Sequence, residues 1–318
     1  MISLKPKISI IGCGNVGMRY AYALIIRGLA RQLVLVDMDP RRAEGEAMDL
    51  SHGAPYVSPV DVIAGGYPET RDSDIVVITA GKKQKPGQTR QDLVKDNVEI
   101  FRSIIPEIVK HSPSAILLIA SNPVDVMAYA AWKFSGKPAH EVIGSGTVLD
   151  SARFRFELAK HCVIDPHNIH AYILGEHGDS EFAAWSKVMI GGSLFSEYCV
   201  VCKNNHTCSH PGDLEKIFQD VRNSAYEIIE RKGETSYGIG LALVRITRAI
   251  LNNENAILPV SSLVENYAGI NNVYLSLPAV VNLSGVREVF KLTLSTQEEL
   301  ALQNSAATIQ SVIQHITF

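Results

Sequence analysis

The stretch Ile8-Ser9-Ile10-Ile11-Gly12-Cys13-Gly14-Asn15-Val16-Gly17 decides the fold. It joins a short apolar run to a glycine motif, and the motif opens a helical pattern. The first glycine permits a tight turn, the second lets a pyrophosphate approach the backbone, and the third lets helix and strand pack closely. Free N–H groups and positive potential at a helix N-terminus favour phosphate. The stretch therefore predicts a strand, a turn and a helix that bind a dinucleotide.

Asp37 supports this interpretation, because it lies twenty residues after Gly17 and directly follows a second apolar run. A carboxylate at this place accepts hydrogen bonds from the adenosine ribose hydroxyls. Its negative charge disfavours a 2′-phosphate, so we expect NAD rather than NADP. The alternative, a glycine-rich turn with a chance acidic residue, does not explain why strand, helix and spacing all agree.

The first half of the chain alternates apolar runs with helical patterns. Such alternation is typical of a doubly wound parallel sheet, whose strands are buried on both faces. The expected strands are 8–11, 33–36, 75–78 and 115–119, and the expected helices are 16–27, 41–50, 91–110 and 124–133.

The pattern changes after Ile143, where Gly144-Ser145-Gly146 marks an expected domain boundary. A helix is expected from about residue 149 to 160, and another lies over 214–228, with Asp213 as its cap and Gly233 after its end. We therefore predict an α/β protein with a Rossmann NAD-binding domain over 1–145, to which about 237–255 contributes. An α+β substrate-binding domain follows over 146–318.

Composition sets the class of protein. A chain of 318 residues exceeds the usual size of one domain, so two domains that share a cleft are expected. The hydrophobic fraction of 46% and charged fraction of 20% indicate a globular protein, and the net charge of -3 gives no footprint for nucleic acid. We expect no signal peptide, no membrane span and no membrane partner. Five cysteines fit a reducing interior, so the expected location is cytoplasmic.

The candidate chemistry lies in Gly175-Glu176-His177-Gly178-Asp179, where an acidic-flanked histidine between two glycines suits an exposed proton donor. Asp150 and Arg153 are three residues apart, about 60° around a helix, so both can face one cleft. Alone, His177 would be an ordinary histidine and the pair a surface ion pair. Beside a dinucleotide motif, they indicate hydride transfer on a small carboxylate.

These motifs together resemble the lactate/malate dehydrogenase family over nearly the whole chain. The matching stretches are 12–17, Gly45-Glu46-Ala47-Met48-Asp49-Leu50, 84–90, Ser121-Asn122-Pro123-Val124-Asp125, 150–153 and 175–179. The resemblance implies an NAD-dependent oxidoreductase that reduces a 2-keto acid.

It also implies roles for the candidate residues. His177 resembles the acid/base, and Asp150 resembles the partner that fixes its tautomer and favours the imidazolium. Arg153 resembles the residue that binds the substrate carboxylate through two parallel hydrogen bonds. Arg90 ends the loop 81–89, which resembles a closing lid that expels water and brings a cation to the carbonyl oxygen.

Three further residues resemble neighbours of the substrate and nicotinamide: Asn122, Thr235 and Ile239. Their alternative interpretation is an ordinary helix terminus or packing position. The expected NAD-binding residues are Gly12, Gly14, Asn15, Val16, Gly17, Asp37, Ala80, Gly81, Asn122 and Ile239.

Gln84 carries the prediction of the substrate. Malate dehydrogenases of the family typically place arginine there to pair with a second carboxylate, whereas lactate dehydrogenases place glutamine. An unpaired carboxylate in a closed site is costly, so Gln84 favours reversible hydride transfer between NADH and pyruvate, giving L-lactate and NAD. Lys82, Lys83 and Lys85 leave malate or another 2-hydroxy acid open. A catalytically silent NAD-binding protein is the alternative from another class.

Regulation and metal binding are the last predictions. Arg155 and His170 resemble the subunit-interface anion site of family members that fructose 1,6-bisphosphate activates, although a plain interface charge is an equal alternative. A homotetramer is implied by the resemblance alone. Cys199, Cys202 and Cys208 with His206 offer soft ligands, but their spacing matches no standard zinc site. We expect free thiols in a loop and no metal.

Overall fold

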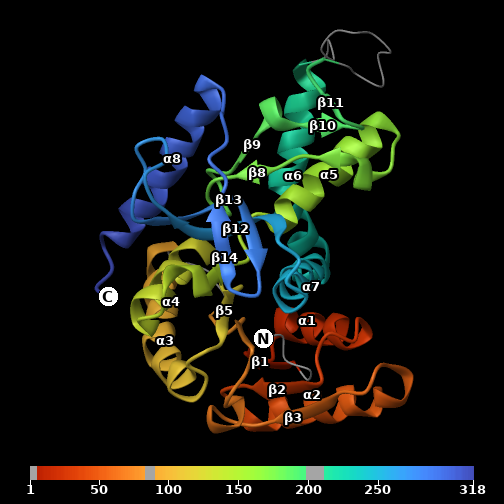
Figure 1. Cartoon of the computed structure of the whole chain (residues 1–318), viewed down its shortest axis with the longest axis vertical. Coiled ribbons are helices and arrows are strands. Elements are labelled where there is room, and N and C mark those ends of the chain that lie inside the picture. Colours follow the sequence, from red (N-terminus) through yellow and green to blue (C-terminus); the bar gives the residue numbers. More distant parts are fainter. Residues whose placement is uncertain (1–5, 83–89, 198–210) are drawn as a thin grey trace.

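The computed structural model describes residues 6–82, 90–197 and 211–318. One sheet organises this part of the chain, in the order β14-β13-β12-β6-β5-β4-β1-β2-β3 (Figure 1). Its six parallel strands run in the order β3-β2-β1-β4-β5-β6, that of a Rossmann fold. They are β1 (Lys7–Ile11), β2 (Gln32–Val36), β3 (Asp61–Ala64), β4 (Ile75–Ile78), β5 (Ile116–Ile119) and β6 (Val142–Gly144).

The doubly wound parallel sheet is thus confirmed. The four expected strands correspond to β1, β2, β4 and β5, whereas β3 and β6 were not predicted. β3 begins with the exposed Asp61 and is only partly buried, whereas the equally long β4 and β5 are apolar and buried throughout. β6 has only three residues, too few to be recognised alone.

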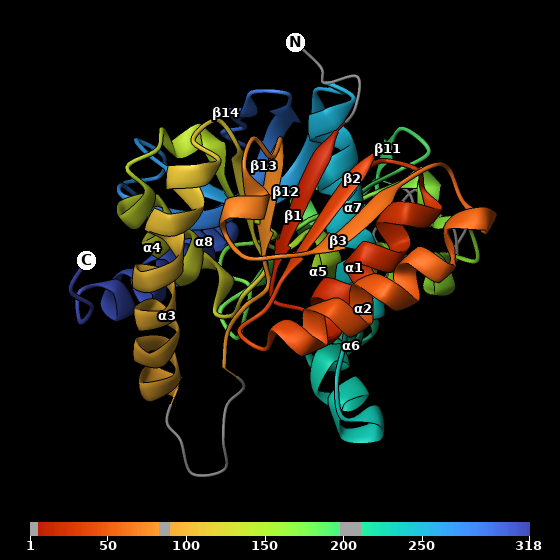
Figure 2. The same cartoon turned by 90° about the horizontal axis from the view of Figure 1, so that it is seen from below.

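Helices cover both faces of the parallel part of the sheet (Figure 2), and alternating side chains of its strands are buried on the two faces. Ile8 and Ile10 belong to one apolar cluster, and Ile11 belongs to the other. The first cluster includes residues of α1 (Asn15–Ile26), α2 (Pro40–His52) and α7 (Tyr237–Leu251). The second includes residues of α3 (Arg90–His111) and α4 (Val124–Ser135). Burial of strands on both faces explains their nearly continuous apolar runs.

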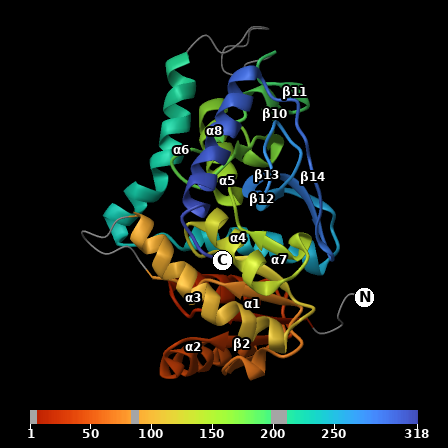
Figure 3. The ribbon, with the colours of Figure 1, turned by 90° about the vertical axis from the view of Figure 1, so that its left-hand side faces the viewer.

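The second half of the chain extends the same sheet. Antiparallel β12 (Ala256–Val264) joins β6 where Ser261 pairs with Gly144, and β13 (Val273–Asn282) and β14 (Gly285–Val289) follow. The helix α8 (Thr296–Ile313) begins at a capping box formed by Ser295 and Glu298. The sheet is therefore continuous from the dinucleotide motif into the second half (Figure 3).

A third apolar cluster holds α5 (Val148–Cys162) against α6 (Pro211–Lys232). The prediction that Asp213 caps α6 is wrong: the helix already begins at Pro211, a residue type suited to the first helical turn. Gly233, with φ +80°, follows its last residue.

Short strands and 3-10 helices complete the described fold. The strands are β7 (Ile169–His170), β8 (Ile173–Leu174), β9 (Phe182–Ala183), β10 (Met189–Ile190) and β11 (Ser193–Leu194). The 3-10 helices are Ala54–Tyr56, Pro68–Thr70, Ala139–Glu141, Pro166–Asn168 and Trp185–Lys187. Within the described residues, none of the helices combines the length and apolar character that a membrane span requires.

Candidate active site

The glycine motif lies between β1 and α1, and its three glycines meet different surroundings. Gly12 has φ +108°, and a Cβ there would lie 2.7 Å from the amide nitrogen of Ala80. A Cβ on Gly17 would collide with the carbonyl oxygen of Gly12. Among the described residues other than its chain neighbours and its own helix backbone, no atom lies within 4 Å of a Cβ built on Gly14. Two glycines are therefore required by packing, while the middle one borders open space that a pyrophosphate could fill.

The groups around this space also suit NAD. Gly14 is the N-cap of α1 and supplies no side-chain acceptor, so the first-turn N–H groups of Asn15, Val16 and Gly17 suit a phosphate. The two Asp37 oxygens accept hydrogen bonds from the backbone N–H groups of Cys13, at 2.7 Å, and Asp39, at 3.0 Å. Each carboxylate oxygen retains a further lone pair for a ribose hydroxyl.

Ala80 and Gly81 follow β4 beside this space. The Ser121 hydroxyl donates to the Ala80 carbonyl at 2.6 Å, and the Asn97 side chain accepts from the backbone N–H of Lys82 at 2.8 Å. These contacts fix the chain between the cofactor space and α3. The backbone N–H groups after Gly14 and the carboxylate of Asp37 thus suit the pyrophosphate and the ribose of a dinucleotide.

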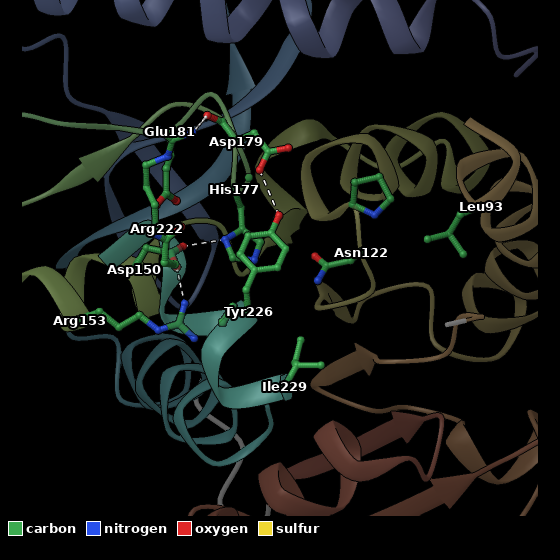
Figure 4. A pocket seen from close by; sticks show the side chains of 14 residues that line it. Leu93, Asn122, Asp150, Arg153, His177, Asp179, Glu181, Arg222, Tyr226 and Ile229 are labelled. Carbon is green, nitrogen blue, oxygen red and sulfur yellow. Dashed lines mark hydrogen bonds and ion pairs between the residues drawn. The ribbon is translucent and has the colours of Figure 1, made fainter. Parts of the chain in front are cut away.

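A pocket of about 460 Å³ lies among the N-terminal ends of α3, α4 and α5, the segment after β8, and α6. Figure 4 shows side chains from these elements pointing into one space. Asn122, Asp150, Arg153 and His177 line it, as do Glu181 and Arg222, which the sequence did not single out.

His177, Asp150 and Arg153 form one hydrogen-bonded group in this pocket (Figure 4). His177 Nδ1 lies 2.6 Å from Asp150 Oδ2, and Arg153 Nη1 donates to Asp150 Oδ1 at 2.8 Å. The Asp150 side chain is 3% exposed, whereas that of His177 is 27% exposed. The carboxylate is therefore held behind the imidazole, and the imidazole borders the space where a substrate would bind.

The electrostatics of the group favour the imidazolium. Burial alone would lower the pKa of His177, but the charge and hydrogen bond of Asp150, with the charges of Glu181 and Asp125, raise it to about 9. Burial alone would raise the pKa of Asp150, but His177 and Arg153 hold it below its ordinary value. At neutral pH the pair is thus an imidazolium and a carboxylate.

The loop that carries His177 is anchored from three sides. Gly175 exchanges backbone hydrogen bonds with Ser276 of β13, at 2.9 and 3.0 Å. The Glu176 N–H donates to the Ser305 hydroxyl of α8 at 2.6 Å. The His177 N–H donates to Asp125 Oδ2 at 2.8 Å. Elements from the end of the chain therefore fix the position of the imidazole.

The sequence analysis quoted Asp125 in a motif but gave it no role. It is buried at the start of α4, and its Oδ1 accepts a hydrogen bond from the Ser261 hydroxyl at 2.6 Å. Burial raises its pKa to about 6, although the hydrogen bonds from Ser261 and His177 act in the opposite direction. An acidic residue inside an apolar helix is the sequence signal that could have drawn attention to it.

The other predicted substrate and cofactor residues lie around the pocket or beyond it. Asn122 lines the pocket, and its carbonyl accepts from Asn97 Nδ2 at 2.9 Å. Thr235 and Ile239 lie just before and within the first turn of α7, and neither is among the residues that line the pocket. Arg90 is the first residue of α3; its side chain and Gln84 lie outside the described part.

The remaining candidates lie away from the pocket or outside the described residues. Lys82 pairs with Asp96 of α3, with Nζ and Oδ2 3.2 Å apart, whereas Lys83 and Lys85 lie outside. Arg155 is half-buried on α5, where burial and the charge of Arg245 lower its pKa despite the opposing effect of Tyr172, and His170 is exposed on β7. Cys199, Cys202, Cys208 and His206 also lie outside the described residues.

Asp150, His177 and Glu181 are the described group whose donor atoms could share a metal ion, since these atoms lie within 4.8 Å of one another. The Asp150 oxygens are already engaged by His177 and by the cationic Arg153. This arrangement matches a proton-transfer group better than a metal centre, whose ligands would compete with both hydrogen bonds.

Comparisons with known proteins identify similar sequences over nearly the whole chain. The model of the lactate/malate dehydrogenase NAD binding domain matches residues 6–144, and that of the lactate/malate dehydrogenase alpha/beta C-terminal domain matches 147–317. The chain is 51% identical to L-lactate dehydrogenase 1 of Clostridium acetobutylicum over 314 residues, covering 98% of this chain and 99% of the relative. It is also 51% identical to L-lactate dehydrogenase of a Thermoanaerobacter species over 310 residues, covering 98% and 99%.

Solved structures of lactate dehydrogenases are also similar to this chain. A lactate dehydrogenase from a Medee basin deep-sea metagenome library superposes with a TM-score of 0.93 at 48% identity, covering 98% of both chains. The minor L-lactate dehydrogenase of Enterococcus mundtii, in a ligands-bound form, gives a TM-score of 0.94 at 42% identity, covering 99% of this chain and 100% of that one.

Proposed function

The chain belongs to the lactate/malate dehydrogenase family, and on that premise we propose how the residues of its pocket divide the chemistry. The activity is that of an NAD-dependent L-lactate dehydrogenase, which interconverts pyruvate and NADH with L-lactate and NAD. The observation that carries the residue roles is the hydrogen-bonded group His177, Asp150 and Arg153 at the pocket wall.

Arg153 binds the substrate carboxylate. One of its terminal nitrogens donates to Asp150, and the guanidinium has further N–H donors in the same plane. Two parallel hydrogen bonds from such a fork fix the orientation of a carboxylate as well as its position. The substrate carbonyl is thereby directed toward His177.

His177 transfers the proton. Its Nδ1–H is held by Asp150, so the proton that reaches the pyruvate carbonyl oxygen comes from Nε2. Bound NADH supplies the hydride to the carbonyl carbon. After the transfer, His177 is neutral and keeps the Nδ1–H bond to Asp150, and lactate oxidation reverses each step. Asp150 keeps the tautomer correct in both directions.

The remaining roles follow from the family. We assign Arg90 to the carbonyl oxygen, where a cation stabilises the developing negative charge. We assign substrate selection to Gln84, because a neutral amide would leave a second carboxylate unpaired. Asn122, Thr235 and Ile239 adjoin the substrate and the nicotinamide, and residues 12–17 with Asp37, Ala80 and Gly81 bind NAD.

NADH oxidation with pyruvate and with oxaloacetate, measured separately at equal concentrations, tests the substrate assignment. We expect pyruvate to give the higher kcat/KM. Activity with oxaloacetate alone would show that Gln84 does not set the preference. Absence of activity with either acid would contradict the residue roles as a whole.

We further propose a homotetramer that fructose 1,6-bisphosphate activates at Arg155 and His170, in a cytoplasmic setting where the described thiols Cys13 and Cys162 stay reduced. Support for the anion site comes from Arg155 and Arg245, because their two positive charges repel each other and an anion bound there would reduce this repulsion. Added fructose 1,6-bisphosphate should raise the velocity at low pyruvate, and Arg155→Gln should abolish the increase. An unchanged velocity in the wild type would refute activation.

A further inference from the structure

Glu181 is a buried carboxyl group in the wall of the substrate pocket. It lies directly before β9, is 7% exposed, and its backbone N–H donates to the Gly178 carbonyl at 3.1 Å. Its carboxylate oxygen lies within 4.8 Å of donor atoms of both Asp150 and His177. The roles assigned above to His177, Asp150 and Arg153 leave this group unused.

The surroundings of Glu181 contain charges of both signs. The described ionisable groups of the pocket and its base are Asp125 on α4, Asp150 and Arg153 on α5, His177 and Asp179 after β8, and Arg222 and Tyr226 on α6. Burial and the charge of Asp150 raise the pKa of Glu181 to about 8, whereas His177, Arg153 and Arg222 act in the opposite direction. The carboxyl is therefore neutral at pH 7 and close to its midpoint at pH 8.

The charge balance of the substrate complex explains what such a group would do. Imidazolium His177, carboxylate Asp150 and Arg153 together carry one positive charge, and Arg222 and Asp179 add one charge of each sign. Arg90, assigned above to the carbonyl oxygen, and Asp125, which is ionised at pH 7 because its pKa is about 6, also add one charge of each sign. The single negative charge of pyruvate neutralises this set. An ionised Glu181 would leave an uncompensated negative charge at a buried position, where it is costly.

We propose that the substrate carboxylate binds at Arg153 only when Glu181 is protonated, so that a molecule in which Glu181 is ionised takes up one proton from solvent on binding, holds it through turnover, and releases it after the product leaves. The inference rests on the proposed binding of substrate at Arg153. Glu181 thus acts through the charge of the pocket. Its protonation sets the alkaline limit of substrate binding, and it does not itself donate the proton to substrate.

The number of protons required for pyruvate reduction tests this proposal. If His177 and Glu181 must both be protonated, kcat/KM for pyruvate falls at high pH toward about a hundredfold per pH unit, and with His177 alone toward about tenfold. We expect the steeper fall in the wild type and the shallower one in Glu181→Gln. Removing the carboxylate also lowers the pKa of His177, which shifts the onset of the fall and leaves its steepness unchanged.

Lactate oxidation gives an independent readout, because it requires neutral His177. In the wild type, kcat/KM for lactate should pass through a maximum and fall at high pH as Glu181 ionises. In Glu181→Gln it should rise to a plateau. Glu181→Asp, which keeps a titratable carboxyl, should restore the maximum in lactate oxidation and the second proton in pyruvate reduction.

Glu227→Gln is the matched control, since Glu227 lies on α6, outside the residues that line the pocket, and its carboxylate pairs with Arg231 at 3.0 Å. It should keep both wild-type profiles. A wild-type fall of only tenfold per pH unit, or a hundredfold fall that persists in Glu181→Gln, would overturn the proposal. The wild-type slope decides even if Glu181→Gln does not fold.

The outcome is separable from that of the proposed function. Oxamate, an unreactive isostere of pyruvate, should bind the wild-type NADH complex. Its affinity should fall with rising pH as steeply as kcat/KM for pyruvate, because binding requires the same two protons. Oxamate binding that responds to one proton, together with normal pyruvate reduction, would reject the role of Glu181 and leave the residue roles intact. No binding of oxamate and no reduction would reject the residue roles themselves.

Discussion

Asp150 shows how one buried carboxylate sets the chemistry of two neighbours. It accepts hydrogen bonds from both His177 and Arg153, and its own side chain is almost wholly enclosed. Because it holds the imidazolium, the pKa of His177 reaches about 9. Pyruvate reduction therefore keeps its proton donor at neutral pH and loses it as the pH rises through about 9, while lactate oxidation gains its base over the same range.

Asp150→Asn should lower kcat for pyruvate reduction by about 10²–10⁴-fold at neutral pH, because the amide no longer stabilises the imidazolium or fixes its tautomer. The alkaline limb of the pH profile should shift to lower pH as well. Steady-state kinetics over the pH range measure both effects. Asp213→Asn, the same change on the exposed first turn of α6, is the control; an unshifted limb in Asp150→Asn would contradict this role.

Arg153 tests whether the pocket needs a planar fork or only a positive charge. Arg153→Lys should reduce kcat/KM for pyruvate by at least about 100-fold, since an ammonium group cannot form the two parallel hydrogen bonds. The affinity for NADH, measured by fluorescence, should stay the same. Nearly normal kcat/KM in the variant would show that charge alone suffices.

At the scale of elements, the turn between β1 and α1 separates packing from ligand binding. Gly14→Ala should leave the melting temperature unchanged but weaken NADH binding by about tenfold or more, because its methyl group meets none of the described residues beyond its own turn and enters the cofactor space. Gly17→Ala should destabilise the protein by about 1–3 kcal/mol, since its methyl group would collide with the backbone of Gly12.

Thermal unfolding and NADH titration of the two variants provide the comparison. Equal losses of stability would show that Gly14 is also needed for packing. Equal affinities for NADH in Gly14→Ala and the wild type would place the pyrophosphate elsewhere.

At the scale of the whole molecule, the first half of the chain depends on the second. Leu243, Ile246 and Ile250 of α7 belong to the same apolar cluster as β1, and the Tyr20 hydroxyl of α1 lies 2.7 Å from that of Thr247. The edge of strand β6 also pairs with β12. We propose that α7 is part of the nucleotide-binding unit, although it follows α6 in the chain.

A fragment of residues 1–145 should therefore fail to fold alone, because it would expose the face that α7 covers and the edge that β12 pairs. Circular dichroism and NADH binding of the fragment test this, and urea unfolding of the full chain should give coincident transitions by both probes. A folded fragment that binds NADH would show that the first half is autonomous.

Much of the fold and of the site could be predicted from the sequence, because the motifs that indicate them lie within short stretches of the chain. The glycine motif works through backbone contacts within one turn, and the strands β1, β2, β4 and β5 are apolar enough to show as hydrophobic runs. The partly exposed β3 and the three-residue β6 gave no such signal, and their pairing depends on neighbours distant in the chain. The roles assigned to Gln84 and Arg90 rest on the family pattern.

The sequence by itself determined the chemical groups of this protein: the dinucleotide turn, the acid at Asp37, and the histidine, aspartate and arginine of the pocket. Only the tertiary structure decided how those groups are tuned. It places Asp125 under the His177 loop, brings Glu181 beside Asp150, and anchors that loop with β13 and α8. Burial and the proximity of charges set the pKa of each group, and both arise from contacts between segments far apart in the chain.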